Sequence, residues 1–502
     1  MNDPQAAQRV YAAFRQAFPA GRLVVVSNRE PYTHARDAAG AISVERPAGG
    51  LALALDPVLR ALGGSWVAWG HGDADREVVD EHDRVRVPPE NPEYTLRRLW
   101  LSEEEIENYY FGFSNQGLWP ICHNILEHVR FRDRYWQAYG EVNDRFARAA
   151  AEEIGEGAGL IWFQDYHLAL APAIARELRP DATLAHFWHI PWPAWETYRV
   201  CPWKVELLEG LLANDLLGFH LDTFANNFLT ACVRELDAFV DLSKQAVVHR
   251  GHLTRVAAFP ISIDVQHFEE IAQSPETEAR MARIVARFGL QHKRVGIGVD
   301  RLDYTKGIVE RLEALRILFQ RYPEFVGSFT FIQIAVPSRS EIPAYQILED
   351  EVDAKIERLN AALATDDWQP VITIKESVPQ NELAAFYRLA DVAVVSSIQD
   401  GMNLVVKEFV ACQDMDDPGA VCLSEFAGAS DELDHTLPVN PLYTEGFADD
   451  LRRALEMPLA ERRERMAEMK ADLADNTIYT WMADSLAAAG AARAEVLSGY
   501  AG

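Results

Sequence analysis

The feature that most constrains the fold is a regular alternation between short apolar runs and amphipathic stretches. The first run, RLVVVSN at residues 22–28, is rich in β-branched residues and predicts a fully buried strand. Further strands are predicted by SWVAWG, LIWFQDYH, TLAHFWHIP, DLLGFHL, RVGIGVDRLDY, FTFIQIAVPS, VITIKES and DVAVVSSI. Helical patterns lie between several of them, as at Leu312, Leu315, Leu318 and Phe319. Strands that alternate with helices predict doubly wound α/β domains with parallel sheets.

The chain has 502 residues, which suggests two or three domains. One series of strands is complete near RVAAFPISID at residues 255–264, and a new strand begins at Arg294 after a polar amphipathic stretch. We therefore expect two Rossmann-like domains that face each other, over residues 1–262 and 263–475. The last segment, 476–502, predicts a helix that packs back on the first domain.

Composition excludes several classes of partner. The net charge of -28 argues against nucleic acids and anionic membranes, because both are bound through a basic field. No apolar run is long enough to span a membrane, and the N-terminus lacks the apolar region of a secretory signal. The five cysteines show no CxxC pair and are expected to be free thiols, without a disulfide framework or a zinc site. We therefore expect a cytoplasmic protein.

In this acidic chain, the stretch VDRLDYTKGIVER places Arg301 and Lys306 where a strand gives way to a helix. The two cations could simply pair with the neighbouring acids Asp300, Asp303 or Glu310. Their position favours another interpretation, because strand-to-helix turns of α/β proteins face the ligand crevice. Gly307 would let the backbone come close to a ligand where the helix begins. A diphosphate would then meet two cations and a helix N-terminus together.

A second stretch, SSIQDGMNLVVKEFV, has the same relation to a strand. The turn from Asp400 to Asn403 predicts a helix N-terminus whose free N–H groups could bind a ligand. Glu408 lies about two turns further along that helix and could reach a ribose diol. The alternative is a solvated glutamate on a surface helix.

The first half of the chain offers weaker signals. The pair Gly49 and Gly50 precedes an apolar helix and is either a simple turn or a close approach to a phosphate. Asp165 and His189 each follow a predicted strand, which favours a pair in a crevice over two structural residues. The sequence has no GxGxxG fingerprint and no Ser-His-Asp, HExxH or GxSxG arrangement, so dehydrogenases and hydrolases gain no support.

These stretches together resemble the trehalose-6-phosphate synthase family, which are retaining glycosyltransferases with two Rossmann-like domains (GT-B type). The resemblance extends from Arg22 to about Trp481. It rests on VVVSNR, AGGL, YYFGFSNQGLWP, QDYHL, HIPWP, DLLGFH, DRLDYTKG, PSRSEIPAY, DGMNLVVKE and LSEFAGAS, in this order. Against this background the DAD sequence at residues 73–75, which is similar to the metal-binding carboxylates of another glycosyltransferase class, is interpreted as a charged turn.

The resemblance implies a role for each matching residue. Arg301 and Lys306 would hold the donor diphosphate, and Glu408 the nucleotide ribose. His189 would hydrogen-bond the transferred sugar, and Asp165 the acceptor. The donor sugar would be held by Asp400 and by the backbone of Gly401, Met402, Asn403 and Leu404. The acceptor phosphate would be surrounded by Arg29, Tyr110, Trp119 and Arg339, with Gly50 in a mobile glycine loop on the donor side.

The family implies transfer of glucose from a nucleotide-glucose to glucose 6-phosphate, with no metal and no other cofactor, for the synthesis of trehalose as a compatible solute and osmoprotectant. The polar segment between Arg29 and Gly49, with REPY and WVAW, is similar to glucosylglycerol-phosphate synthases, so glycerol 3-phosphate is an alternative acceptor. A second alternative is a catalytically inactive regulatory protein that binds sugar nucleotides. A third alternative is an enzyme that couples an unsaturated cyclitol to an amino cyclitol phosphate. The sequence is compatible with a homo-oligomer. It does not specify the base of the nucleotide donor.

Overall fold

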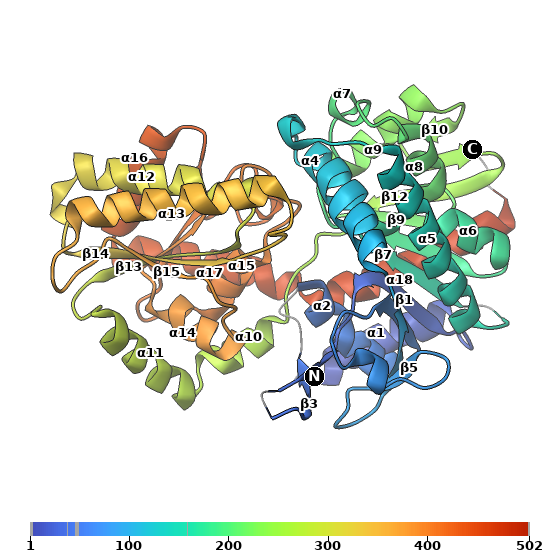
Figure 1. The fold of residues 1–502 in the computed structure, drawn as a ribbon, viewed down its shortest axis with the longest axis horizontal. Helices are drawn as coiled ribbons and strands as arrows, with labels where there is room; N and C mark the ends of the chain where they lie inside the picture. Colours follow the sequence, from blue (N-terminus) through green and yellow to red (C-terminus); the bar gives the residue numbers. More distant parts are fainter. Residues whose placement is uncertain (1–3, 38, 46–49, 158, 500–502) are drawn as a thin grey trace. The chain divides into compact units, whose positions relative to one another are not determined.

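The computed structural model describes residues 4–37, 39–45, 50–157 and 159–499 (Figure 1). The described chain divides into two compact units. Unit 1 lies within Asp3–Ile261 and Ile478–Gly502, and unit 2 is Ser262–Thr477. Each unit has a sheet with a parallel core and helices on its faces, which confirms the predicted α/β class with two Rossmann-like domains.

The sheet of unit 1 has ten strands in the order β10-β11-β12-β9-β8-β7-β1-β4-β6-β5. Seven neighbouring strands, from β12 to β6, run parallel to one another. The edges are antiparallel, since β5 pairs with β6, and β11 with β10 and β12; the sequence pattern did not predict these edges. A separate antiparallel hairpin pairs β2 with β3. The strands of unit 1 are β1 (Leu23–Arg29), β2 (Thr33–Arg36), β3 (Ile42–Glu45), β4 (Ser65–Trp69), β5 (Arg84–Val87), β6 (Tyr94–Leu99), β7 (Leu160–Gln164), β8 (Thr183–Phe187), β9 (Leu216–Phe219), β10 (Phe239–Asp241), β11 (Ala246–His249) and β12 (His252–Ala258).

Helices pack on both faces of this sheet, so every residue of the central strand β1 except Arg29 is buried. The helices of unit 1 are α1 (Pro4–Ala17), α2 (Gly50–Leu62), α3 (Glu103–Glu105), α4 (Trp119–Cys122), α5 (Asp133–Ile154), α6 (Ala171–Leu178), α7 (Trp195–Tyr198), α8 (Lys204–Leu211), α9 (Asp222–Glu235) and α18 (Ile478–Ser498). A π-helix, η2 (Ile106–Leu118), precedes α4, and short 3-10 helices are η1 (Asp75–Glu77), η3 (Leu126–His128) and η4 (Tyr166–Leu168). In the described parts of the chain, no helix has both the length and the apolar character that crossing a membrane requires.

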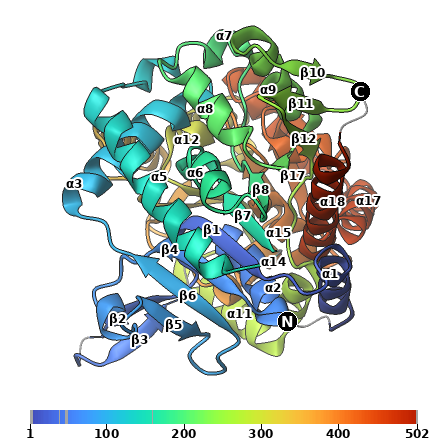
Figure 2. The same cartoon turned by 90° about the vertical axis from the view of Figure 1, so that its right-hand side faces the viewer.

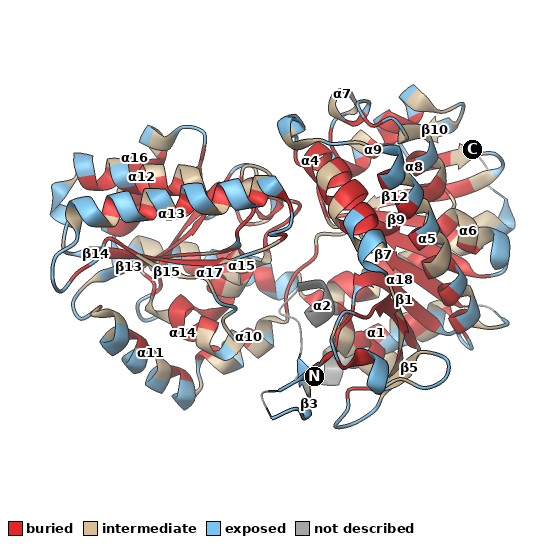
Figure 3. Cartoon of the chain, viewed as in Figure 1, coloured by how far each residue is buried: buried red, intermediate tan, exposed pale blue. Residues whose placement is uncertain are grey.

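The sheet of unit 2 is parallel throughout, in the order β15-β14-β13-β16-β17-β18. Helices α12, α13 and α16 cover one face, and α10, α11 and α14 lie on the other (Figure 1). Figure 3 shows that α12 and α13 are buried toward the sheet and exposed on their outer sides. The strands are β13 (Arg294–Arg301), β14 (Phe329–Val336), β15 (Val371–Ile374), β16 (Val392–Val395), β17 (Ala420–Ser424) and β18 (Leu437–Val439). The helices are α10 (Val265–Ala272), α11 (Pro275–Phe288), α12 (Ile308–Arg321), α13 (Pro343–Leu363), α14 (Gln380–Leu389), α15 (Leu404–Cys412), α16 (Thr444–Glu456) and α17 (Leu459–Asp475), with 3-10 turns η5 (Tyr304–Lys306), η6 (Pro323–Phe325) and η7 (Gly428–Asp431).

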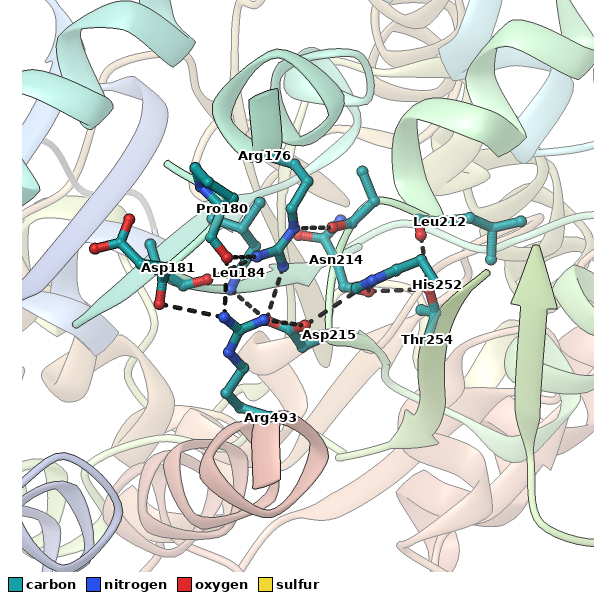
Figure 4. Close-up of polar contacts among 12 residues, drawn as sticks. Arg176, Pro180, Asp181, Leu184, Leu212, Asn214, Asp215, His252, Thr254 and Arg493 are labelled. Carbon is teal, nitrogen blue, oxygen red and sulfur yellow. Dashed lines mark hydrogen bonds and ion pairs between the residues drawn. The ribbon is translucent and has the colours of Figure 1, made fainter. Parts of the chain in front are cut away.

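Helix α18 follows unit 2 in the sequence but belongs to unit 1, where it lies beside α1 (Figure 2). A buried polar cluster attaches it to the sheet (Figure 4). Asp215 is fully buried and lies 2.8 Å from Arg176 Nη2 and 3.5 Å from Arg493 Nη1 of α18. The Arg493 guanidinium also donates to the carbonyl oxygen of Pro180, at 2.9 Å. One carboxylate therefore holds two guanidiniums, one of which comes from the last helix.

This arrangement predicts that Asp215→Ala destabilises unit 1. Removing one partner from a buried ion pair typically costs about 3–5 kcal/mol, because the remaining charge is left uncompensated. Urea denaturation should therefore show a large fall in the free energy of unfolding. The matched control is Asp181→Ala, which removes an exposed carboxylate 3.0 Å from Arg179 and should cost about 1 kcal/mol or less. Equal losses in the two variants would contradict this account of how α18 is attached.

Candidate functional site

The ends of two neighbouring strands in unit 2, β13 and β16, lead to residues predicted to bind the donor, and the next strand, β14, leads to Arg339. Because β14, β13 and β16 are parallel neighbours, their carboxyl ends lie at one edge of the sheet. Arg301 ends β13 and is exposed, Lys306 lies in the turn after it, and Asp400 follows β16. The structure thus brings these residues to one edge, as the sequence predicted.

Lys306 and Asp400 form the centre of this group. The Lys306 Nζ donates to Asp400 Oδ2 at 2.6 Å, and both side chains are 14% exposed. The same carboxylate oxygen accepts from Ser397 Oγ at 3.1 Å and from Asn403 Nδ2 at 3.2 Å. The alternative that Lys306 pairs with a neighbouring acid is wrong, because its carboxylate partner lies 94 residues away along the chain.

Asp303 lies two residues after the end of β13 and is fully buried. Burial alone would raise its pKa, but the charges of Arg339, Arg301 and Lys306, together with a hydrogen bond from the N–H of Thr305, hold the pKa of Asp303 below its usual value. Arg339 Nη1 donates to Asp303 Oδ2 at 3.2 Å and to the Tyr345 hydroxyl at 2.5 Å. Arg339 is therefore a buried residue of this cluster.

Two glycines of the predicted motifs have structural reasons that the sequence did not show. Gly307 has a φ of +60°, and a Cβ there would lie 2.0 Å from the carbonyl oxygen of Ser396. A Cβ on Gly428 would lie 2.2 Å from the carbonyl oxygen of Gly401. Both glycines thus allow two loops of the site to pack against each other, whereas the sequence suggested that Gly307 admits a ligand.

The DGMN turn opens α15 as predicted. Gly401 and Met402 are buried, Asn403 is the N-cap, and its Oδ1 accepts from the N–H of Val406 at 3.3 Å. Leu404 is the first helical residue. The turn is also fixed from the side, since the N–H of Asp400 donates to the carbonyl of Phe426 at 3.1 Å.

Glu408 lies on α15, and its carboxylate accepts a hydrogen bond from the Tyr387 hydroxyl at 2.9 Å. Burial raises the pKa of Glu408 to about 7, while the bond from Tyr387 lowers it in part. The alternative of a solvated surface glutamate is therefore wrong. Tyr387 was not predicted from the sequence, because a tyrosine on an apolar helix face resembles any core residue.

In unit 1, Arg29 and Tyr110 lie together. The exposed Arg29 donates from Nη2 to the Tyr110 hydroxyl at 3.1 Å. Its guanidinium carbon also lies 5.1 Å from the centre of the Tyr110 ring and 5.5 Å from that of Trp69. Trp69 ends β4 and was missed as a site residue, because a tryptophan that ends an apolar strand looks like part of the core.

A row of rings connects Tyr110 to Trp119. Tyr110 stacks on His167 with centroids 5.8 Å apart, His167 contacts Tyr166 at 4.0 Å, and Tyr166 contacts Trp119 at 5.7 Å. Tyr110 belongs to the π-helix η2, a rare geometry that is often found at functional sites. The predicted residues Tyr110 and Trp119 are therefore both buried parts of one aromatic row.

Asp165 and His189 are in contact, as predicted. The Asp165 carboxylate accepts from the backbone N–H of His189 at 3.2 Å and from that of Tyr166 at 3.0 Å. Asp165 has a φ of 70°, a strained conformation for a residue with a side chain. The His189 ring lies 2.9 Å from Gln164 Oε1. Burial is the main cause that holds the pKa of His189 well below its usual value, and the neighbouring His220 and His186 lower it further. His189 is therefore neutral near pH 7.

Two further predictions concern unit 1. Gly50 is the first residue of α2, whereas Gly49 lies outside the described residues. The DAD sequence is a charged turn only at the exposed Asp73; Asp75 is fully buried 2.8 Å from Arg98 Nη2, so the prediction is wrong for Asp75.

In the described chain no three His, Cys, Asp or Glu side chains gather as metal ligands would, and the five cysteines are buried free thiols.

Comparison with known proteins relates the chain to one group of enzymes. Residues 21–490 match glycosyltransferase family 20. The sequence is 38% identical over 488 residues to the trehalose-6-phosphate synthase of Mycobacterium marinum, covering 95% of each chain. It is 37% identical over 489 residues to the bifunctional trehalose-6-phosphate synthase/phosphatase of Thermoproteus tenax, covering 95% of this chain and 65% of that longer relative. The crystal structure of a UDP-forming alpha,alpha-trehalose-phosphate synthase from Burkholderia xenovorans in complex with glucose-6-phosphate matches with a TM-score of 0.82 at 33% identity, over 92% of this chain and 98% of that chain.

The raised pKa of Glu408 predicts how the stability of unit 2 depends on pH. Between the usual value of 4.5 and about 7, the folded state holds a proton on Glu408 that the unfolded state releases, so the free energy of unfolding falls as pH rises. Glu408→Gln removes this dependence and should become more stable relative to the parent protein as pH rises from 4 to 8. Thermal melts of both proteins across this range measure the difference. A constant difference would contradict the raised pKa.

Proposed function

Because the chain belongs to glycosyltransferase family 20, we propose that it is a retaining glucosyltransferase that moves glucose from a nucleotide-glucose to glucose 6-phosphate, giving α,α-trehalose 6-phosphate. The family inferred from the motifs is thereby confirmed. The observation that carries the proposed activity is the cluster of Arg301, Lys306 and Asp400 at the strand ends of unit 2. This cluster combines cations for a diphosphate with a carboxylate for sugar hydroxyls.

On the donor side, Arg301 and Lys306 bind the diphosphate, in agreement with their place at the end of β13. When phosphate oxygens take up the Lys306 ammonium, the Asp400 carboxylate is left to accept hydrogen bonds from the sugar hydroxyls. The backbone from Gly401 to Leu404 frames the same sugar, and Glu408 accepts a hydrogen bond from the ribose. The proposal includes no metal and no cofactor, and the name of the Burkholderia relative supports UDP as the nucleotide released.

On the acceptor side, Arg29 and Tyr110 bind the phosphate of glucose 6-phosphate. A guanidinium and a phenol suit a phosphate dianion, because charge-assisted hydrogen bonds are the stronger ones. The relative crystallised with glucose-6-phosphate supports this acceptor over glycerol 3-phosphate. Asp165 is assigned to an acceptor hydroxyl and His189, as a neutral imidazole, to the transferred sugar. Trp119 and Arg339 stay predicted ligands of the acceptor phosphate, and Gly50 a predicted residue of the donor side.

The chemical step follows from these positions. The bond between the anomeric carbon and the phosphate oxygen breaks, and the electron pair goes to the diphosphate. Arg301 and Lys306 stabilise the negative charge that develops there, and such preorganised charges supply much of the catalysis in enzymes. The acceptor hydroxyl attacks from the face that the diphosphate leaves, and its proton passes to the departing phosphate oxygen. Configuration is retained without a covalent intermediate.

The product places the protein in the synthesis of trehalose, a compatible solute. A cytoplasmic location and a homo-oligomer stay predictions.

The activity is tested by a matrix of donors and acceptors. Purified protein is incubated with UDP-, ADP- or GDP-glucose and with glucose 6-phosphate or glycerol 3-phosphate, and products are identified by mass spectrometry and by NMR of the anomeric protons. We expect trehalose 6-phosphate with both anomeric carbons of its one glycosidic linkage in the α configuration. A product from glycerol 3-phosphate alone would assign the other acceptor. Nucleotide binding without transfer would favour the regulatory protein.

Substitutions on the two sides should separate the two phosphate sites. Arg29→Ala should raise the KM for glucose 6-phosphate about 10- to 100-fold, since a hydrogen bond to a charged group contributes about 1.5–3 kcal/mol. The Kd for UDP should stay nearly unchanged. Lys306→Ala should instead weaken UDP and lower kcat/KM by about 10²-fold or more.

The matched control is Arg22→Ala. Arg22 is exposed just before β1, at the strand's opposite end from Arg29, and its removal should leave both constants within about twofold. Isothermal titration gives the UDP affinity, and steady-state kinetics gives the acceptor KM. If Arg29→Ala and Lys306→Ala reduce affinity for both ligands equally, the assignment of two separate sites is refuted.

A further inference from the structure

A fully buried arginine, Arg311 in the first turn of α12, forms hydrogen bonds to segments that lead to the residues assigned to the donor. Its Nη1 donates to Asp300 Oδ2 at 2.8 Å and to Gln333 Oε1 at 2.9 Å. Its Nε donates to Ser396 Oγ at 2.9 Å. These partners belong to three different segments, namely β13, β14 and the residue that follows β16.

The chain leaves room for this guanidinium at one position. A Cβ on Gly298 would lie 2.2 Å from Arg311 Nη1, so any other residue there would displace the guanidinium. Gly298 is the second glycine of GIGVDR, a stretch that lacks the third glycine of a dinucleotide fingerprint. The structure thus gives this glycine a different purpose, which is to admit an arginine from the following helix.

Arg311 reaches the donor turn through Ser396. The Ser396 hydroxyl accepts from Arg311 Nε and shares its one hydrogen between two backbone carbonyls, that of Gly307 at 2.9 Å and that of Lys306 at 3.1 Å. A short chain of hydrogen bonds therefore runs from the buried guanidinium to the backbone of the lysine that contacts Asp400. A planar group with donors at fixed angles suits this task better than a flexible ammonium does.

Charge gives Arg311 a second effect on the same site. Asp300 directly precedes Arg301 and is buried, so its carboxylate needs a counter-charge. Arg311 supplies it at 2.8 Å. Without this pair, a buried negative charge would lie next to the cations assigned to the diphosphate and would oppose anion binding.

We propose that Arg311 is a positioning residue of the donor site, which acts through Ser396 on the backbone of Lys306 and through Asp300 on the charge beside Arg301. Arg311 does not touch the substrate in this proposal. It aligns the ends of β13 and β16, which lead to Arg301 and Asp400 respectively, while Gln333 of β14 holds the guanidinium in place. The inference rests on the proposed binding of a nucleotide donor to these strand ends.

The test compares Arg311→Lys and Ser396→Ala with the parent protein. Ser396→Ala removes the hydrogen bonds that link Arg311 Nε to the turn, while Asp300 and Gln333 still hold the guanidinium, and it should weaken UDP binding about 3- to 10-fold, the range expected for one hydrogen bond. Its melting temperature should change by less than a few degrees. Arg311→Lys keeps the positive charge but loses the planar set of N–H donors that reaches three partners. It should lower kcat about 10- to 100-fold, because small displacements of reacting groups have effects of this size. The KM for glucose 6-phosphate should stay within about twofold in both variants.

Arg316→Lys is the matched control, since Arg316 lies on the same helix, is half exposed and pairs with Glu313. It should leave UDP affinity and kcat unchanged. The proposal is overturned if Ser396→Ala and Arg311→Lys lower only the melting temperature, or if they raise donor and acceptor constants equally. If the parent protein binds UDP but transfers no glucose, the proposed function is contradicted, and the UDP affinities of the variants still decide the role of Arg311. If the parent protein does not bind UDP, the proposed function and the role of Arg311 are both refuted.

Discussion

The guanidinium of Arg311 joins β13, β14 and the residue after β16 with bonds of 2.8, 2.9 and 2.9 Å, and the geometry of the residues assigned to the donor is proposed to depend on it. A buried charge is expensive unless it is paired and fully hydrogen-bonded. Asp300 supplies the counter-charge, and Gln333 and Ser396 accept further hydrogen bonds, whereas Arg311 Nη2 has no hydrogen-bond partner among the described residues. Asp300 lies on the segment that continues to Arg301 and Lys306, and Ser396 on the one that continues to Asp400, so these bonds help to set where the three residues lie.

Three of the residues singled out from the sequence have strained backbone. Asp165, Arg339 and Asn403 have φ values of 70°, 53° and 92°, in a region that residues other than glycine rarely adopt. Conformations of this kind cost about 1–3 kcal/mol each and persist where surrounding contacts determine them. Here the contacts are the N–H of His189 on Asp165, the Asp303 carboxylate on Arg339, and the N–H of Val406 on Asn403. All three residues belong to the group singled out from the sequence.

The sequence predicted the elements whose signal is local. Apolar runs predicted the buried strands, and the turn after β13 was recognisable because two cations follow a strand end. Partners distant in the sequence could not be predicted. Asp75 looks like a residue of a solvated turn, but its side chain meets Arg98 from another strand. Glu408 resembles a surface glutamate, yet Tyr387 on a neighbouring helix is its hydrogen-bond donor. The edge strand β5, with the sequence RVRV, was missed because the predicted strands were continuous apolar runs, whereas this strand at the edge of the sheet alternates charged residues with valine.

The central claim is that the strand ends of unit 2 bind a nucleoside diphosphate through Arg301 and Lys306. A crystal structure of the protein with UDP tests it most directly. The account predicts diphosphate oxygens within hydrogen-bond distance of both cations, with the Lys306 ammonium shared between phosphate and Asp400, and the ribose hydroxyls on Glu408. UDP bound elsewhere on the chain, with Lys306 still engaged by Asp400 alone, would contradict the account.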